Sequence, residues 1–157
     1  MTTRQLQSVD SGAAAGPQRL TIAVLFTDTE GTAAALRQAE ALARDLNLSI
    51  TLLIIHVVPF PAQLSEPLVS RSFLEEQARS LVAGCQADVT IKICICREKL
   101  DAIRASLPPR SLVVMGAHEH WWQSRRERRL ARTLRRHGHQ VVLVKCGAAT
   151  TFGGADA

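Results

Sequence analysis

Short runs of Leu, Ile and Val recur along the chain, and each is separated from the next by a segment with helical spacing. Four of these runs are apolar on both faces and span 20–26, 49–58, 112–115 and 141–144. Such runs are typical of strands buried inside a parallel sheet. The remaining run, 89–96, alternates Ile with other residues, which indicates a strand near a sheet edge.

The segments between the runs have the periodicity and the end signals of helices. Helices are expected after the turn at 27–31, over 65–84, over 98–107 and over 124–137. Strands that alternate with helices in this order predict right-handed βαβ crossovers and a doubly wound, mostly parallel α/β domain. Ligands of such sheets bind at the carboxyl ends of the strands, where the strand order reverses.

The length of 157 residues suits a single domain, which we place at 19–146. Residues 1–18 and 147–157 are rich in small and polar residues, and we expect a disordered leader and a disordered tail there. The sequence has no signal-peptide pattern and no run near the roughly 18–20 apolar residues of a membrane span, so a cytoplasmic protein is expected. Its four cysteines are therefore expected to be buried thiols and not disulfides.

Three stretches carry a resemblance to a known family. They are Leu52-Leu53-Ile54-Ile55-His56-Val57-Val58-Pro59, Ser111-Leu112-Val113-Val114-Met115-Gly116-Ala117-His118 and Val141-Val142-Leu143-Val144-Lys145. Over about 19–145 the chain resembles the universal stress protein family. The resemblance implies a three-layer α/β/α sandwich of the adenine nucleotide alpha hydrolase type. It also implies a five-stranded sheet in the order 3-2-1-4-5, with a site between the first and fourth strands.

Members of this family that bind ATP carry a glycine pattern after the fourth strand. The pattern is Gly, two residues, Gly, nine residues, Gly, then Ser or Thr, because backbone N–H groups must approach phosphate oxygens closely. Here only Gly116 matches, since Glu119 stands at the second glycine position and Arg129-Leu130 at the final pair. A glutamate facing phosphate would repel it, and a leucine offers no hydroxyl.

The first strand departs from the family pattern as well. Thr27 aligns with the Asp of ATP-binding members, although Asp28 is adjacent to it. The resemblance therefore implies a vestigial nucleotide pocket formed by Thr27, Asp28, Val57, Gly116, His118 and Glu119. We expect no cofactor and no enzymatic activity, and a role as a stress-response or regulatory binding protein. The alternative is an ATP-binding member with an atypical phosphate loop and slow hydrolysis.

The expected fourth helix is strongly basic. Its arginines are Arg125, Arg126, Arg128, Arg129, Arg132, Arg135 and Arg136. One interpretation is a solvated face on a helix that covers the sheet through Leu130 and Leu134, since like charges at these spacings repel only weakly. The other is an anion-binding surface, with Arg125, Arg126, Arg129 and Arg132 as candidates and Trp121-Trp122 available to stack on a base. The other helices are mixed in sign, which favours a protein partner or an anionic ligand over nucleic acid.

Two further kinds of site have little support. His118, Glu119 and His120, followed by His137 and His139, lack the spacing of a zinc site, and no metal is expected. No Gly-x-Ser-x-Gly elbow and no Ser or Cys with an evident base is present, so we assign no catalytic residue.

The last strand predicts a partner. Val141, Val142, Leu143 and Val144 are expected at a sheet edge, yet they lack the charges that usually protect such edges. Pairing with a second copy would cover them, and the family resemblance also implies dimers through this strand. We therefore expect a homodimer.

Overall fold

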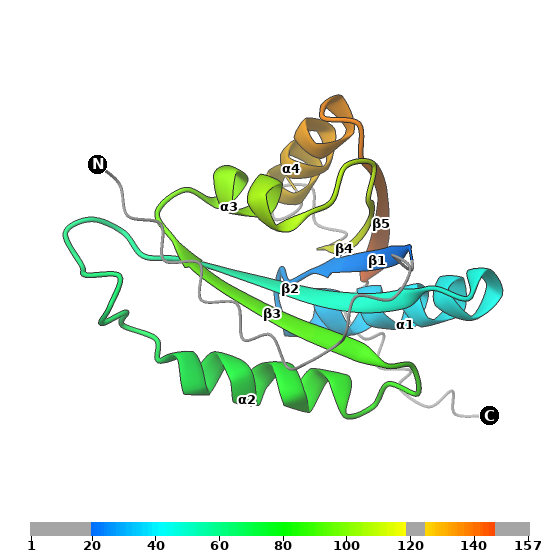
Figure 1. Ribbon diagram of the computed structural model, residues 1–157, viewed down its shortest axis with the longest axis horizontal. Helices are drawn as coiled ribbons and strands as arrows, with labels where there is room; N and C mark the ends of the chain where they lie inside the picture. The colour runs from blue at the N-terminus through cyan, green and yellow to red at the C-terminus, as the bar shows by residue number, and fades with distance from the viewer. Residues whose placement is uncertain (1–19, 119–124, 147–157) are drawn as a thin grey trace, which may run out of the picture.

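The computed structural model describes residues 20–118 and 125–146, in which strands and helices alternate without exception (Figure 1). The elements are β1 (Thr21–Leu25), α1 (Thr29–Leu46), β2 (Ser49–Val57), α2 (Arg71–Val82), β3 (Val89–Cys96), α3 (Lys99–Ser106), β4 (Leu112–His118), α4 (Arg125–Arg136) and β5 (Gln140–Cys146). The leader and tail expected at 1–18 and 147–157 lie outside the described residues.

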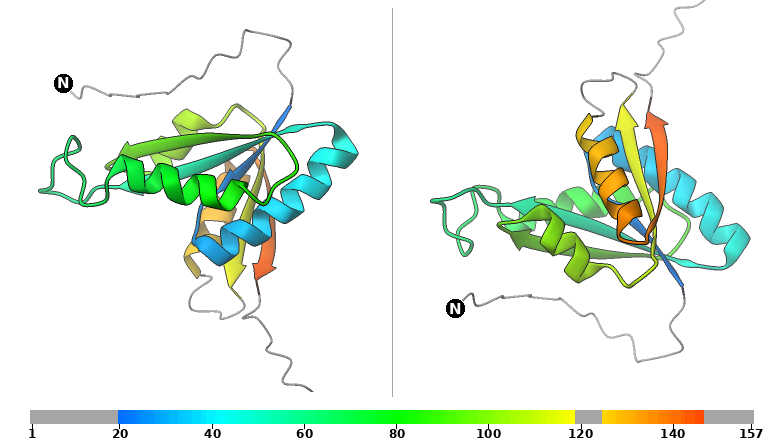
Figure 2. Two further views of the ribbon diagram at one scale, coloured as in Figure 1. Left: turned by 90° about the horizontal axis from the view of Figure 1, so that it is seen from below. Right: turned by 90° about the horizontal axis from the view of Figure 1, so that it is seen from above.

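The five strands form one sheet in the order β3-β2-β1-β4-β5, and all four neighbouring pairs are parallel. Helices α1 and α2 cover one face of the sheet, and α3 and α4 cover the other (Figures 1 and 2). The predicted three-layer sandwich and its strand order are confirmed. The order reverses between β1 and β4, so the carboxyl ends of these two strands flank the crevice where such folds bind ligands.

Each face of the sheet has its own core. On the α1 side, Ile22, Val24 and Leu52 pack against Ala35, Ala39 and other small residues of α1. Small side chains let this helix lie close to the strands. On the α3 and α4 side, Leu25, Val113 and Met115 pack against Ile103, Ala131 and Leu134. The central strands β1 and β4 are buried on both faces, as their continuous apolar runs predict.

Several element ends differ from the prediction. Helix α2 begins at Arg71 and not at Ser65, because the Ser70 hydroxyl accepts the Phe73 N–H at 3.3 Å and caps the helix there. Strands β4 and β5 continue to His118 and Cys146, three and two residues beyond the predicted ends at 115 and 144. Those extensions place the His118 and Cys146 side chains at the end of the sheet.

Other predictions are confirmed by the described residues. Strand β3 lies at a sheet edge, and none of the four cysteines forms a disulfide, although only Cys146 is buried and the other three are half-buried. Burial is the main cause that raises the pKa of Cys96, which reaches about 11. None of the described helices is long and apolar enough to cross a membrane.

Candidate functional site

The turn after β1 ends in a carboxylate that caps α1. Asp28 is the N-cap residue, and its Oδ1 accepts the Gly31 N–H at 2.7 Å. The amino end of a helix carries partial positive charge and free N–H groups, which is where many folds receive phosphate. Here the Asp28 side chain occupies that position itself.

The same carboxylate contacts the end of β4. Its Oδ2 lies 2.7 Å from Nε2 of His118, and Nδ1 of that imidazole lies 3.5 Å from Sγ of Cys146 at the end of β5. Asp28, His118 and Cys146 therefore form one chain of contacts across the ends of three neighbouring strands, β1, β4 and β5. The exposed fractions of the Asp28 and His118 side chains are 40% and 26%, so both are only partly open to solvent.

The chemistry of the carboxylate fixes one hydrogen in this chain. A carboxylate can only accept, so Nε2 of His118 donates to Asp28, and Nδ1 of the same ring faces the Cys146 thiol. Burial, and after it the Asp28 charge, raises the pKa of Cys146, which favours the protonated thiol. Cys146 is thus a satisfied thiol and not an activated nucleophile.

Two glycines bring α1 and β4 into backbone contact. A Cβ added to Gly116 would lie 2.3 Å from the carbonyl oxygen of Gly31 and 2.4 Å from its Cα. A Cβ on Gly31 would in turn lie 2.8 Å from Oγ1 of Thr27. The packing of α1 against β4 is therefore enough to require glycine at position 116, whether or not a phosphate binds there.

The structure unites four of the six predicted pocket residues. Thr27, Asp28, Gly116 and His118 meet at the crevice between β1 and β4, and the Thr27 hydroxyl is buried without a hydrogen-bond partner among the described residues. Val57 is the last residue of β2, in register with Cys96 of β3, and its side chain is exposed. Glu119 lies outside the described residues.

Sequence reasoning missed the parts played by Gly31 and Cys146. Cys146 is in register with His118, since β4 and β5 pair in parallel along their whole length. The signal was present in the sequence, because His118 and Cys146 each follow an apolar run. The carboxyl ends of neighbouring parallel strands lie at the same edge of the sheet. Ending the predicted strands at 115 and 144 concealed this signal.

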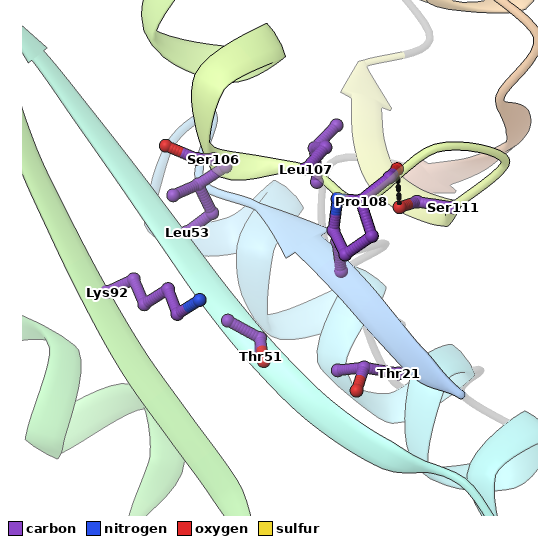
Figure 3. Close-up of a pocket in the computed structure, with 9 residues that line it drawn as sticks. Thr21, Thr51, Leu53, Lys92, Ser106, Leu107, Pro108 and Ser111 are labelled. Carbon is purple, nitrogen blue, oxygen red and sulfur yellow. Dashed lines mark hydrogen bonds between the residues drawn. The ribbon is translucent and has the colours of Figure 1, made fainter. Parts of the chain in front are cut away.

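A pocket of about 80 Å³ lies near the amino ends of the strands (Figure 3). Lys92 reaches across β2 toward Thr51 on one side of this pocket, and Thr21 and Ser111 lie on the other side. The pocket is much smaller than the roughly 300 Å³ at which small-molecule pockets begin. It also contains none of the predicted site residues. No group of three potential metal ligands occurs among the described residues.

The arginines of α4 are all exposed, including the four predicted anion-binding candidates Arg125, Arg126, Arg129 and Arg132. Leu134 is buried and Leu130 half-buried beneath them, as the covering-helix interpretation predicts. Strand β5, with Val141, Val142, Leu143 and Val144, lies at the sheet edge as predicted. One cation protects that edge after all, since Arg135 donates to the Val141 carbonyl at 2.9 Å.

A comparison with solved structures supports this fold assignment. A universal stress protein from Archaeoglobus fulgidus matches with a TM-score of 0.54 and 11% sequence identity, over 80% of this chain and 93% of that chain. A universal stress protein solved in complex with cAMP matches at 18% identity and a TM-score of 0.47, over 80% of this chain and 96% of that chain. No family model and no curated protein matches the sequence. The chain has the fold of the universal stress proteins.

Proposed function

We propose that this chain is a universal-stress-type regulatory binding protein that does not hold ATP in the manner of the family's nucleotide-binding members. The observation that carries the proposal is the contact between Asp28 and His118 across the crevice between β1 and β4. A phosphate approaching this point would meet a carboxylate that already caps α1. Both oxygens of that carboxylate already have hydrogen-bond partners. The carboxylate therefore supplies the negative charge that the amino end of α1 would otherwise take from a bound anion.

The glycine comparison supports the same proposal. In nucleotide-binding members the first glycine of the motif serves phosphate approach, but Gly116 is explained here by its contact with Gly31. Neither Arg129 nor Leu130 can replace the glycine and hydroxyl of the family motif, and their helix begins at Arg125. The remaining family-like glycine is therefore no argument for a phosphate site.

The proposal includes no catalytic step. The only Cys, His and Asp chain among the described residues ends in a thiol that burial keeps protonated. We infer instead a cytoplasmic binding module that acts in a stress response through a protein surface or a small ligand.

The proposed active form is a homodimer through β5. In a parallel strand, alternate residues direct both backbone groups to the same side. The Gln140 N–H bonds β4, so the N–H and C=O groups of Val141, Leu143 and Lys145 face outward. Arg135 already occupies the Val141 carbonyl. The outward backbone N–H and C=O groups around Leu143 therefore remain available. Antiparallel pairing with β5 of a second copy would give them hydrogen-bond partners.

Thermal melting with Mg-ATP tests the nucleotide part of the proposal. Ligand at about 100 times its Kd stabilises a protein by about 2.7 kcal/mol, which would raise the Tm of a chain of this size by roughly 5–10 °C. We expect no shift at about 1 mM Mg-ATP, while an ATP-binding universal stress protein melted in parallel shifts upward. A shift of that size, or nucleotide retained through purification, would instead establish the ATP-binding alternative.

A further inference from the structure

Charge is divided unequally between the two helical layers. Helices α3 and α4 carry nine Lys and Arg side chains and two acidic ones. On the opposite face of the sheet, α1 and α2 carry four Arg side chains and five acidic ones. The sheet separates these layers (Figure 2), so the positive charge of the described chain is concentrated on one face. The helices that carry both positive and negative charges lie mostly on the other face of the sheet. In the sequence, these helices argue against a binding surface for a polyanion.

The arginines of α4 also share one side of their helix. At about 100° per residue, six of the seven fall within an arc of roughly 120°, and Arg126 flanks that arc. The arc is opposite Leu130 and Leu134, which pack against the sheet. Over the roughly 18 Å of this helix, the guanidinium groups recur on every turn.

Five of the seven α4 arginines have no carboxylate partner among the described residues. None of Arg126, Arg128, Arg129, Arg132 and Arg136 forms an ion pair with another described residue. Glu127, the one acidic residue of α4, has a buried Oε2 and so turns away from them. The basic surface continues onto a second element, because the Arg104 guanidinium of α3 contacts the His137 ring just after α4.

We propose that the exposed face of α4, extended by Arg104, binds the phosphate backbone of nucleic acid. A repeating row of guanidinium groups matches a polymer that carries one charge per about 1.7 Å of duplex axis, and guanidinium forks fit phosphate oxygens in pairs. An acidic protein partner fits less well. Protein interfaces have an apolar core with aromatic anchors, whereas nucleic-acid interfaces are polar and positive. Helix α4 presents no exposed large apolar side chain.

The inference predicts binding without base specificity. Guanidinium groups that are engaged by phosphates are not available to base edges, and no other side chain of α4 is both exposed and able to donate hydrogen bonds to them. Phosphate contacts position a protein but carry no sequence information. Affinity should therefore depend on salt and be insensitive to the sequence of the duplex.

The test is fluorescence anisotropy with a labelled DNA duplex of about 20 base pairs at several salt concentrations from about 50 to 200 mM. The variant R128Q/R132Q/R136Q removes three outward guanidinium groups, and Gln keeps helix propensity. The matched control R37Q/R44Q/R79Q removes the same charge from exposed positions on α1 and α2. Circular dichroism confirms that both variants are folded.

We expect the wild-type protein and the control to bind at low salt with a steep salt dependence. The α4 variant should show a slope of log K against log salt that is shallower by about one per arginine removed. No binding at about 50 mM salt would overturn the proposal, as would equal weakening of the two variants, which would indicate net charge alone. Polyglutamate, tested as a second probe, should bind more weakly than the duplex. Tighter binding of polyglutamate would assign the face to an acidic protein and overturn the inference.

Discussion

Gly116 on β4 lies against Gly31 on α1 so closely that a single methyl group on Gly116 would stand 2.3 Å from the Gly31 carbonyl oxygen. This approach draws the amino end of α1 onto the end of β4. It places Asp28 in contact with His118 at the point where the strand order reverses. The same glycine that suggests a phosphate site in the sequence thus has a packing role in the fold.

Substituting Gly116 with Ala should be strongly destabilising. The new Cβ meets backbone atoms, which cannot rotate away, so we expect a loss near the upper end of overpacking effects, about 3 kcal/mol. Urea denaturation measures the free energy of unfolding. Gly84→Ala is the matched control, since nothing lies within 4 Å of its added Cβ, and it should change stability by less than about 1 kcal/mol. Similar stability of wild type and Gly116→Ala would contradict the close approach.

Two substitutions of Asp28 separate its capping role from its charge. Asp28→Ala removes the acceptor of the Gly31 N–H and should cost about 1–2 kcal/mol. Asp28→Asn keeps an acceptor oxygen, so urea denaturation should show most of that loss restored. If the two variants lose stability equally, the hydrogen bond to Gly31 is not what holds the turn.

The predictable and unpredictable parts of this crevice have different physical origins. The strand positions followed from apolar runs, and the strand order from the family resemblance. Together they bring His118 and Cys146 to one edge, which was predictable once both strands were extended by a few residues. The contact of Asp28 with His118 was not, because it depends on side-chain rotamers and on how closely α1 approaches β4. That approach is fixed by Gly31, which in the sequence is indistinguishable from an ordinary turn glycine.

The pH dependence of stability should include a contribution from His139. This side chain is buried, and its Nδ1 accepts the Ser111 N–H at 3.2 Å, so the folded state favours the neutral ring. Burial, and after it the neighbouring His137, lowers the pKa of His139 below its ordinary value of 6.5. The unfolded chain therefore binds the proton more readily, and stability falls as the pH decreases below 6.5 toward the folded-state pKa.

Denaturation of wild type and His139→Asn from about pH 7.5 to 5.5 measures this contribution. Asn retains an acceptor for the Ser111 N–H but does not titrate. We expect the free energy of unfolding to decrease more steeply with falling pH in the wild type than in the variant. Parallel pH profiles would show that His139 is not held neutral.

The dimer proposal predicts a specific effect at Leu143. Its N–H faces away from β4, so Leu143→Pro should remove an intermolecular donor while the β4–β5 hydrogen bonds remain. Light scattering should give twice the 17.1 kDa chain mass for the wild type and the single-chain mass for the variant. Leu143→Ala, which shortens the side chain but keeps the N–H, should stay dimeric. A wild-type monomer at micromolar concentration would remove the proposal.

The central claim is that Asp28 and His118 close the nucleotide crevice, and isothermal titration of Mg-ATP into the wild-type protein tests it most directly. The account predicts no saturable heat up to about 1 mM nucleotide. Saturable binding of one ATP per chain with a Kd below about 100 μM would contradict it.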